Sequence, residues 1–162
     1  MSRGGARSRG FTLVEVMVVV AIIGILAVLA VPYMSRARMR AQNAAFVNDL
    51  RTLSDNVMEQ FAIAHGDYPA EALSGVMPPE VAGYMPGRID WSIPTPIGGL
   101  WHWERAARRG EFRDGCYAGL VVEGPLRTSA QMAEIDSQID DGDLNTGRFR
   151  ACPSGYIRIL ED

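Results

Sequence analysis

A long run of uncharged residues near the N-terminus constrains this chain more than any other feature. Residues 16–34 carry no charge, and Glu15 is the one charged residue within 11–34. A helix rises about 1.5 Å per residue, so the run would extend about 28 Å, close to the thickness of the hydrocarbon core of a bilayer. The run therefore predicts a helix that spans a membrane.

A cleaved secretory signal is the alternative, because basic residues precede the apolar ones. Such a signal has a shorter apolar core that is followed by a small-residue cleavage site. Here the run continues through Pro32 into a polar, helix-compatible stretch at residues 35–65. We therefore expect the span to be retained, with Pro32 as a point where the helix bends or opens locally.

Glu15 is the anomaly of this segment, because a carboxylate in an apolar helix costs roughly 2.5–3.5 kcal/mol on insertion scales. No basic residue follows it within the next turns. The positive partner that such a charge needs must therefore come from elsewhere.

The residues around Glu15 form the string Arg9-Gly10-Phe11-Thr12-Leu13-Val14-Glu15-Val16. This string resembles the cleavage and methylation motif of type IV pilins and type II secretion pseudopilins, and the resemblance extends through Gly24 to Pro32. It implies that a prepilin peptidase cuts between Gly10 and Phe11 and methylates Phe11. It also implies that Glu15 meets the N-terminal amine of a neighbouring subunit, which would pair two charges that are costly alone.

Orientation in the membrane rests on the resemblance. Three arginines precede the span and three follow it, so the bias of positive charge toward the cytoplasmic side nearly cancels; they are Arg3, Arg7, Arg9, Arg36, Arg38 and Arg40. The family implies an inner-membrane protein with a cytoplasmic N-terminus and a periplasmic head.

The segment after Pro32 predicts an amphipathic helix, because Leu50, Leu53, Val57, Phe61 and Ala64 recur at steps of three and four residues. Gly66 supplies its C-terminal stop. We therefore predict a cleaved leader at 1–10, a transmembrane and filament-core helix at 11–34, an amphipathic helix at 35–66 and a globular head at 67–162.

The head is predicted to be a small antiparallel sheet packed against the long helix, which makes an α+β, pilin-like lollipop. Residues 68–99 are rich in Pro and Gly and read as irregular, with a short helical turn near 79–84. Strands are expected at 100–105, 116–123 and 156–160. A helix is expected at 129–139, where Thr128 and Gln131 can form a capping box.

Cys116 and Cys152 are far apart, and the two histidines, His65 and His102, do not complete a zinc pattern. A disulfide is the favoured interpretation if the head lies outside the cytoplasm. Two buried free thiols are the alternative.

The acidic segment 140–147 offers oxygen ligands at Asp140, Asp141, Asp143 and Asn145. Calcium favours such clusters, and some pseudopilins bind calcium in a late loop, but the EF-hand spacing is absent. A solvated turn that ends the preceding helix is the alternative, and no other cofactor is expected.

Nucleic-acid binding and catalysis are disfavoured. Without the first ten residues, 13 basic and 19 acidic side chains leave a net charge of −6. An acidic chain does not favour the clustered basic surface that nucleic-acid binding requires. His102 with Glu104 is the one pair of catalytic interest, and no nucleophile motif accompanies it. Trp101 and Trp103 lie on one strand face and are expected in the core; the alternative is that Trp91, Trp101 and Trp103 form an aromatic patch for a partner or glycan.

The resemblance thus implies a structural subunit of a type II secretion pseudopilus or a type IV pilus. Its implied partners are the prepilin peptidase, other filament subunits, an inner-membrane assembly platform and membrane lipid. The chain lacks the Asp-Pro-Trp-Gly string of major pseudopilins, and Glu15 argues against the tip subunit that lacks this glutamate. A membrane-tethered periplasmic binding module with a borrowed export signal is the alternative from another class.

Overall fold

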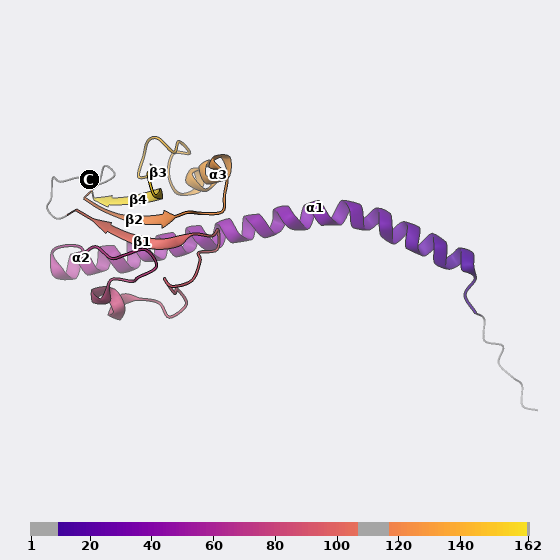
Figure 1. The fold of residues 1–162 in the computed structure, drawn as a ribbon, viewed down its shortest axis with the longest axis horizontal. Helices are drawn as coiled ribbons and strands as arrows, with labels where there is room; N and C mark the ends of the chain where they lie inside the picture. The colour runs from indigo at the N-terminus through magenta and orange to yellow at the C-terminus, as the bar shows by residue number, and fades with distance from the viewer. Residues whose placement is uncertain (1–9, 107–116, 162) are drawn as a thin grey trace, which may run out of the picture. The chain divides into compact units, whose positions relative to one another are not determined.

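The computed structural model describes residues 10–106 and 117–161, and it contains a long N-terminal helix and an antiparallel sheet (Figure 1). Two compact units divide between Arg40 and Ala41. The second unit holds the sheet and the hydrophobic core. The expected α+β fold is confirmed.

Helix α1 (Leu13–Arg51) contains the whole uncharged run and continues through Pro32. A π-helical segment, η1 (Thr52–Met58), and the short helix α2 (Glu59–His65) extend it. Gly66 follows in the left-handed conformation, with φ 79°, and donates its N–H to the carbonyl oxygen of Ala62 at 2.7 Å. The predicted glycine stop is confirmed, because glycine adopts this conformation without a clash at Cβ.

The buried side of the helix differs from the prediction at its end. Leu50, Leu53, Val57 and Phe61 are buried as expected, but Ala64 is exposed. The helical period alone would turn Ala64 toward the core. The core ends at Phe61, however, and the ring of His65 stacks on the Phe61 ring at 4.1 Å.

Four strands form the sheet in the order β1-β2-β4-β3, and every neighbouring pair is antiparallel; they are β1 (Leu100–Arg105), β2 (Ala118–Glu123), β3 (Phe149–Cys152) and β4 (Gly155–Glu161). The sequence predicted strands close to β1, β2 and β4, at 100–105, 116–123 and 156–160. It missed β3, which has four residues and is a strand because it pairs with β4, from Phe149 with Arg158 to Cys152 with Gly155.

The irregular segment before the sheet covers the outer edge of β1. It contains the 3-10 helix η2 (Pro79–Tyr84), in the place that the sequence predicted. The N–H of Gly75 donates to the carbonyl oxygen of Trp101 at 2.8 Å, and the N–H of Ala72 donates to the carbonyl oxygen of Trp103 at 3.2 Å. These bonds occupy an edge that would otherwise be open to another strand.

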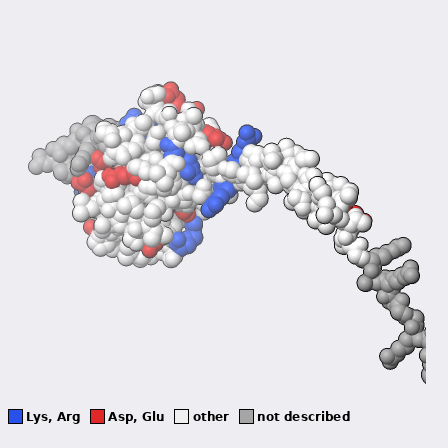
Figure 2. Space-filling view, turned by 45° about the vertical axis from the view of Figure 1, so that its right-hand side comes forward, with Lys and Arg blue, Asp and Glu red and all other residues white. Residues whose placement is uncertain are grey.

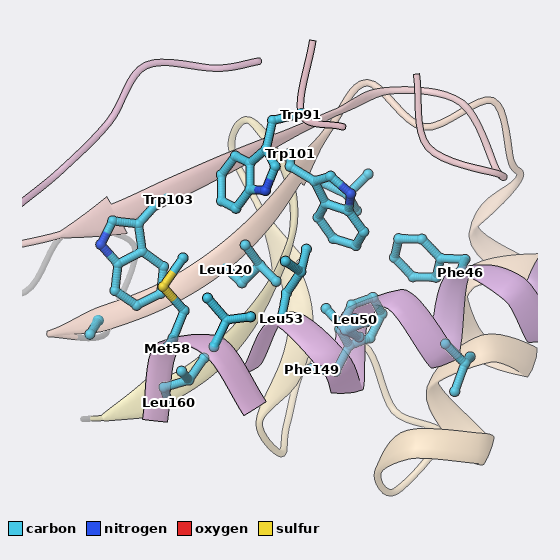
Figure 3. Close-up of a cluster of buried hydrophobic side chains, with 14 of the residues drawn as sticks. Phe46, Leu50, Leu53, Met58, Trp91, Trp101, Trp103, Leu120, Phe149 and Leu160 are labelled. Carbon is cyan, nitrogen blue, oxygen red and sulfur yellow. The ribbon is translucent and has the colours of Figure 1, made fainter. Parts of the chain in front are cut away.

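Aromatic side chains form much of the core between the helix and the sheet (Figure 3). Trp91, Trp101 and Trp103 are all buried, and the ring of Phe46 stacks on that of Trp101 at 5.2 Å. The predicted core position of Trp101 and Trp103 is confirmed.

Helix α3 (Ser129–Ile139) lies between β2 and β3 in the chain. Thr128 accepts a hydrogen bond from the Gln131 N–H at 3.3 Å, and the Gln131 side chain accepts one from the Thr128 N–H at 3.1 Å. The predicted capping box is therefore confirmed, and it satisfies two backbone donors at the helix start.

Candidate functional site

The first candidate site is the start of α1. Gly10 and Phe11 precede the helix and are exposed, Phe11 by 84%. The leader residues 1–9, with Arg3, Arg7 and Arg9, lie outside the described residues. Cleavage between Gly10 and Phe11 stays a prediction.

Thr12 and Glu15 form a second capping box, which the sequence analysis did not identify. The Glu15 carboxylate accepts hydrogen bonds from the Thr12 N–H at 2.8 Å and the Thr12 hydroxyl at 2.9 Å, and the Glu15 N–H donates to that hydroxyl at 3.2 Å. The Thr-x-x-Glu spacing directly before an apolar run was the available signal. These bonds hold the carboxylate beside the first turn of the helix.

The charge of Glu15 has no basic partner in the part of the chain that the structure describes. The next basic residue along the helix is Arg36, about 31 Å away at the helical rise. Hydrogen bonds from Thr12 solvate one oxygen of the carboxylate, but they supply no opposite charge.

The surface of α1 beyond Glu15 is apolar on all sides. The large hydrophobic residues of 11–34 are between 50% and 84% exposed, and in Figure 2 the visible face of the helix is white apart from a red patch beside the grey residues. Among the described residues, one helix is long and apolar enough to span a membrane, and this is the segment concerned. The core of a soluble protein would bury such a surface, but nothing within residues 10–106 and 117–161 covers it.

The second candidate site is a group of three carboxylates at the end of α3. Oxygens of Asp136, Asp140 and Asp141 lie within 4.8 Å of one another. Asp136 is fully buried, and its oxygens make no hydrogen bond of ordinary geometry among the described residues, although the N–H of Gly142 and the carboxyl group of Asp141 lie near enough to affect its pKa. Burial, followed by the charges of Asp141 and Asp140, raises the pKa of Asp136 to about 6.

The loop after α3 folds around this group. Asp140 accepts hydrogen bonds from the N–H groups of Arg148 and Phe149, and Asp141 accepts one from the Thr146 hydroxyl at 2.9 Å. Gly147 lies so close to the Asp140 carboxylate that a side chain there would collide with it. The loop therefore holds two carboxylates against a third that is buried, and no basic residue pairs with them within 10–106 and 117–161.

The structure brings together Asp140 and Asp141 of the predicted calcium ligands, and it adds Asp136. Asp143 is not in the group of carboxylates; its carboxylate instead accepts hydrogen bonds from the N–H of Asn145 at 3.1 Å and from the side-chain amide of Asn145 at 2.8 Å. The spacing of four between Asp136 and Asp140 places both on one helix face, and this was the signal that sequence reasoning missed. Calcium binding stays a prediction.

Of the two cysteines, Cys152 is partly buried at the end of β3, where its sulfur lies 3.5 Å from the Ser154 hydroxyl. Cys116 lies outside the described residues. The disulfide therefore stays a prediction.

His102 and Glu104 do not form a catalytic pair with each other. The His102 ring meets the Glu123 carboxylate at 2.7 Å, and Glu104 is buried in β1. Both are positioned by strand pairing between β1 and β2.

Comparison with known proteins shows to which family this chain belongs. Residues 5–31 match the family model described as the prokaryotic N-terminal methylation motif. The chain is 35% identical over 100 residues to type II secretion system core protein G of Klebsiella michiganensis, a match that covers 56% of this chain and 69% of that protein. The chain belongs to the family of type IV pilins and type II secretion pseudopilins.

Two further relatives agree with this pilin and pseudopilin membership. Type II secretion system core protein G of Escherichia coli is 35% identical over 89 residues, covering 51% of this chain and 61% of that protein. Type IV major pilin protein PilA of Myxococcus xanthus is 45% identical over 53 residues, covering 33% of this chain and 24% of that protein. In one core protein G, that of Pectobacterium carotovorum, the chain spans 43% of the relative's length. No solved structure matches.

The family is one of structural subunits of pseudopili and pili, and it is no known class of enzyme. The exposed apolar helix fits a membrane-anchored subunit of this family.

Proposed function

We propose that this pseudopilin-like chain is cut between Gly10 and Phe11, methylated on Phe11, and assembled from the inner membrane into a helical filament. Its N-terminus faces the cytoplasm and its head the periplasm before assembly. It works as a structural component with no catalytic residues of its own. The observation that carries this proposal is a single carboxylate, Glu15, near the start of the otherwise uncharged segment 11–34, whose apolar side chains are exposed.

Cleavage would create a free amine at Phe11, four residues before Glu15. An amine and a carboxylate are each costly in an apolar surrounding and attract each other strongly there. The family pairs the amine of one subunit with the glutamate of its neighbour, and the same pairing here would fix the axial position of each new subunit. A prepilin peptidase, other filament subunits and an inner-membrane platform are the partners that this pathway requires.

Glu15→Ala tests the proposal. Removal of the charge should leave membrane insertion intact or ease it, because a carboxylate in the span costs roughly 2.5–3.5 kcal/mol. The neighbour's amine would lose its partner, so we expect cleaved, membrane-inserted subunit to accumulate and the yield of sheared filament to fall at least tenfold.

Glu59→Ala is the matched control, because it removes a carboxylate from the same continuous helix outside the span. It should give filament at the wild-type level. Wild-type filament yield from Glu15→Ala, at equal subunit abundance, would contradict the assembly role and favour a tethered binding module.

We further propose that the carboxylates of Asp136, Asp140 and Asp141 hold a calcium ion. The specific support is the buried Asp136 carboxylate, which lies within 4.8 Å of the carboxylates of Asp140 and Asp141 and has no basic partner among the described residues. An isolated buried charge is strongly unfavourable, and a hard divalent cation with oxygen ligands would compensate it. Such an ion would tie α3 to the loop that leads into β3.

Asp136→Asn separates this proposal from a plain solvated turn. Calcium should raise the unfolding temperature of the wild-type protein in detergent relative to the protein in chelator. The variant should lose this shift, and in chelator it should be at least as stable as wild type, because it removes a buried charge.

Glu134→Gln, an exposed change on the same helix, should keep the full calcium shift. An equal calcium shift in wild type and Asp136→Asn would contradict the site.

A further inference from the structure

Three arginines follow the apolar part of α1 at once: Arg36, Arg38 and Arg40. All three are exposed, and none makes an ion pair within residues 10–106 and 117–161. In Figure 2 blue side chains follow the white surface of this helix. We call these three residues the arginine collar.

The collar surrounds the helix, because neighbouring residues of a helix are 100° apart. Arg36 and Arg40 share one face and Arg38 lies on the opposite one. A contact with a single protein surface would need the charges on one side, whereas charges on opposite sides suit a surrounding layer.

The spacing along the helix matches the layer of lipid head groups. Arg36 lies about 3 Å beyond Met34, the last residue of the uncharged run, and Arg40 about 9 Å beyond it at the helical rise. The polar layer on each side of a bilayer core is roughly 5–8 Å thick, so Arg36 and Arg38 fall within it at the helical rise, and the long side chain of Arg40 can reach back into it. Tyr33 at the end of the run is 75% exposed, and tyrosines are enriched at this boundary.

Side-chain direction strengthens this assignment. The Cα–Cβ bonds of a helix tilt toward its N-terminus, which in this chain is the membrane-spanning end. The long arginine side chains therefore lean back toward the bilayer surface. Their planar guanidinium groups match the geometry of phosphate oxygens, and the chain uses no lysine anywhere.

From these observations we propose that the arginine collar binds the phosphates of anionic phospholipid head groups where the span leaves the membrane. The inference rests on the membrane anchoring of the proposed function, and it adds a lipid ligand to it. The collar also explains why three positive charges are tolerated after the span, where the bias of positive residues toward the cytoplasmic side disfavours them.

The test uses the full chain in nanodiscs that contain equal amounts of phosphatidylglycerol and phosphatidylcholine. Native mass spectrometry after release counts the lipids that stay bound. We expect wild type to retain phosphatidylglycerol over phosphatidylcholine by about fivefold, the ratio expected from one favourable charge contact near the surface. Salt at high concentration should reduce this preference by screening.

The Arg36→Gln/Arg38→Gln/Arg40→Gln variant should retain both lipids equally. Arg148→Gln/Arg158→Gln, which removes arginines from the head, should keep the wild-type preference. A preference that survives in the collar variant, or that wild type lacks, overturns the proposal.

Two further arms identify other sources of the same chemistry. If inorganic phosphate competes away the retained phosphatidylglycerol at millimolar concentration, the collar binds free phosphate and the lipid proposal fails. A second outcome is that wild type shows no lipid preference and the collar variant loses the cross-links between subunits. The collar then binds acidic side chains of a second copy, and the lipid proposal fails. Filament yield from Glu15→Ala is independent of both arms, so failure of the collar and failure of the assembly role are distinguishable.

Discussion

Glu123 links β2 to two other segments of the head through one carboxylate. It meets the ring of His102 on β1 at 2.7 Å and accepts a hydrogen bond from Ser74. Burial, the largest single cause, would raise the pKa of Glu123. The hydrogen bonds from Ser74 and His102 and the charge of His102 together outweigh it, so the pKa lies below its ordinary value of 4.5.

The pH dependence of the unfolding free energy should show the contribution of the Glu123 carboxylate. Because the folded pKa lies below the unfolded one, the unfolded state binds more protons, and the contribution of Glu123 is present above pH 4.5 and lost as the pH falls through the folded pKa. Glu123→Gln should therefore give a shallower loss of stability on acidification, measured by denaturant unfolding between about pH 6 and pH 3. Glu134→Gln is the control, and coincident slopes for Glu123→Gln and wild type would contradict the assignment.

At the scale of elements, the π-helical segment decides which side chains enter the core. Leu53, Ser54, Val57 and Met58 within η1 are all buried, and the wider turn of the π-helix brings these four residues onto a narrower arc than a regular helix would at 100° per residue. Beyond Phe61, η2 still contacts the helix through the rings of Tyr84 and His65, 6.3 Å apart, but Ile63 and Ala64 are exposed among the described residues.

Substitutions along this helix should follow the observed burial. Met58→Ala removes a fully buried side chain and should cost about 2–5 kcal/mol of unfolding free energy. Ala64→Glu should change it by less than about 0.5 kcal/mol, because the site faces solvent. The three buried tryptophans provide the fluorescence signal for denaturant titration. A large loss of unfolding free energy for Ala64→Glu with a small loss for Met58→Ala would contradict the observed burial and favour the regular helical pattern.

For the whole molecule, processing would change both length and charge. Loss of residues 1–10 removes three arginines and leaves the side-chain charge at −6, from 13 basic and 19 acidic residues. It would also place the new amine beside the Thr12 and Glu15 capping box.

Intact-mass analysis of membrane-extracted protein checks this processing. We expect loss of residues 1–10 and gain of one methyl group, because Gly10 and Phe11 are exposed before the helix begins. Protein from cells without a prepilin peptidase should keep its full mass. A mature chain that starts at Met1, or after Ala30, in peptidase-positive cells would contradict the processing.

The sequence alone determined the features that depend on neighbours within a turn or a strand repeat. The membrane-spanning run, the stop at Gly66, the capping box of Thr128 and the strand that carries Trp101 and Trp103 all follow from local spacing. Each is specified by backbone hydrogen bonds or side-chain periodicity over a few residues.

Only the tertiary structure decided the features that depend on distant partners. β3 is a strand because β4 pairs with it, Ala64 is exposed because the core stops at Phe61, and Asp136 joins Asp140 and Asp141 because the next loop closes over the end of α3. Burial and pairing are properties of packed elements, and local spacing does not specify which elements will meet.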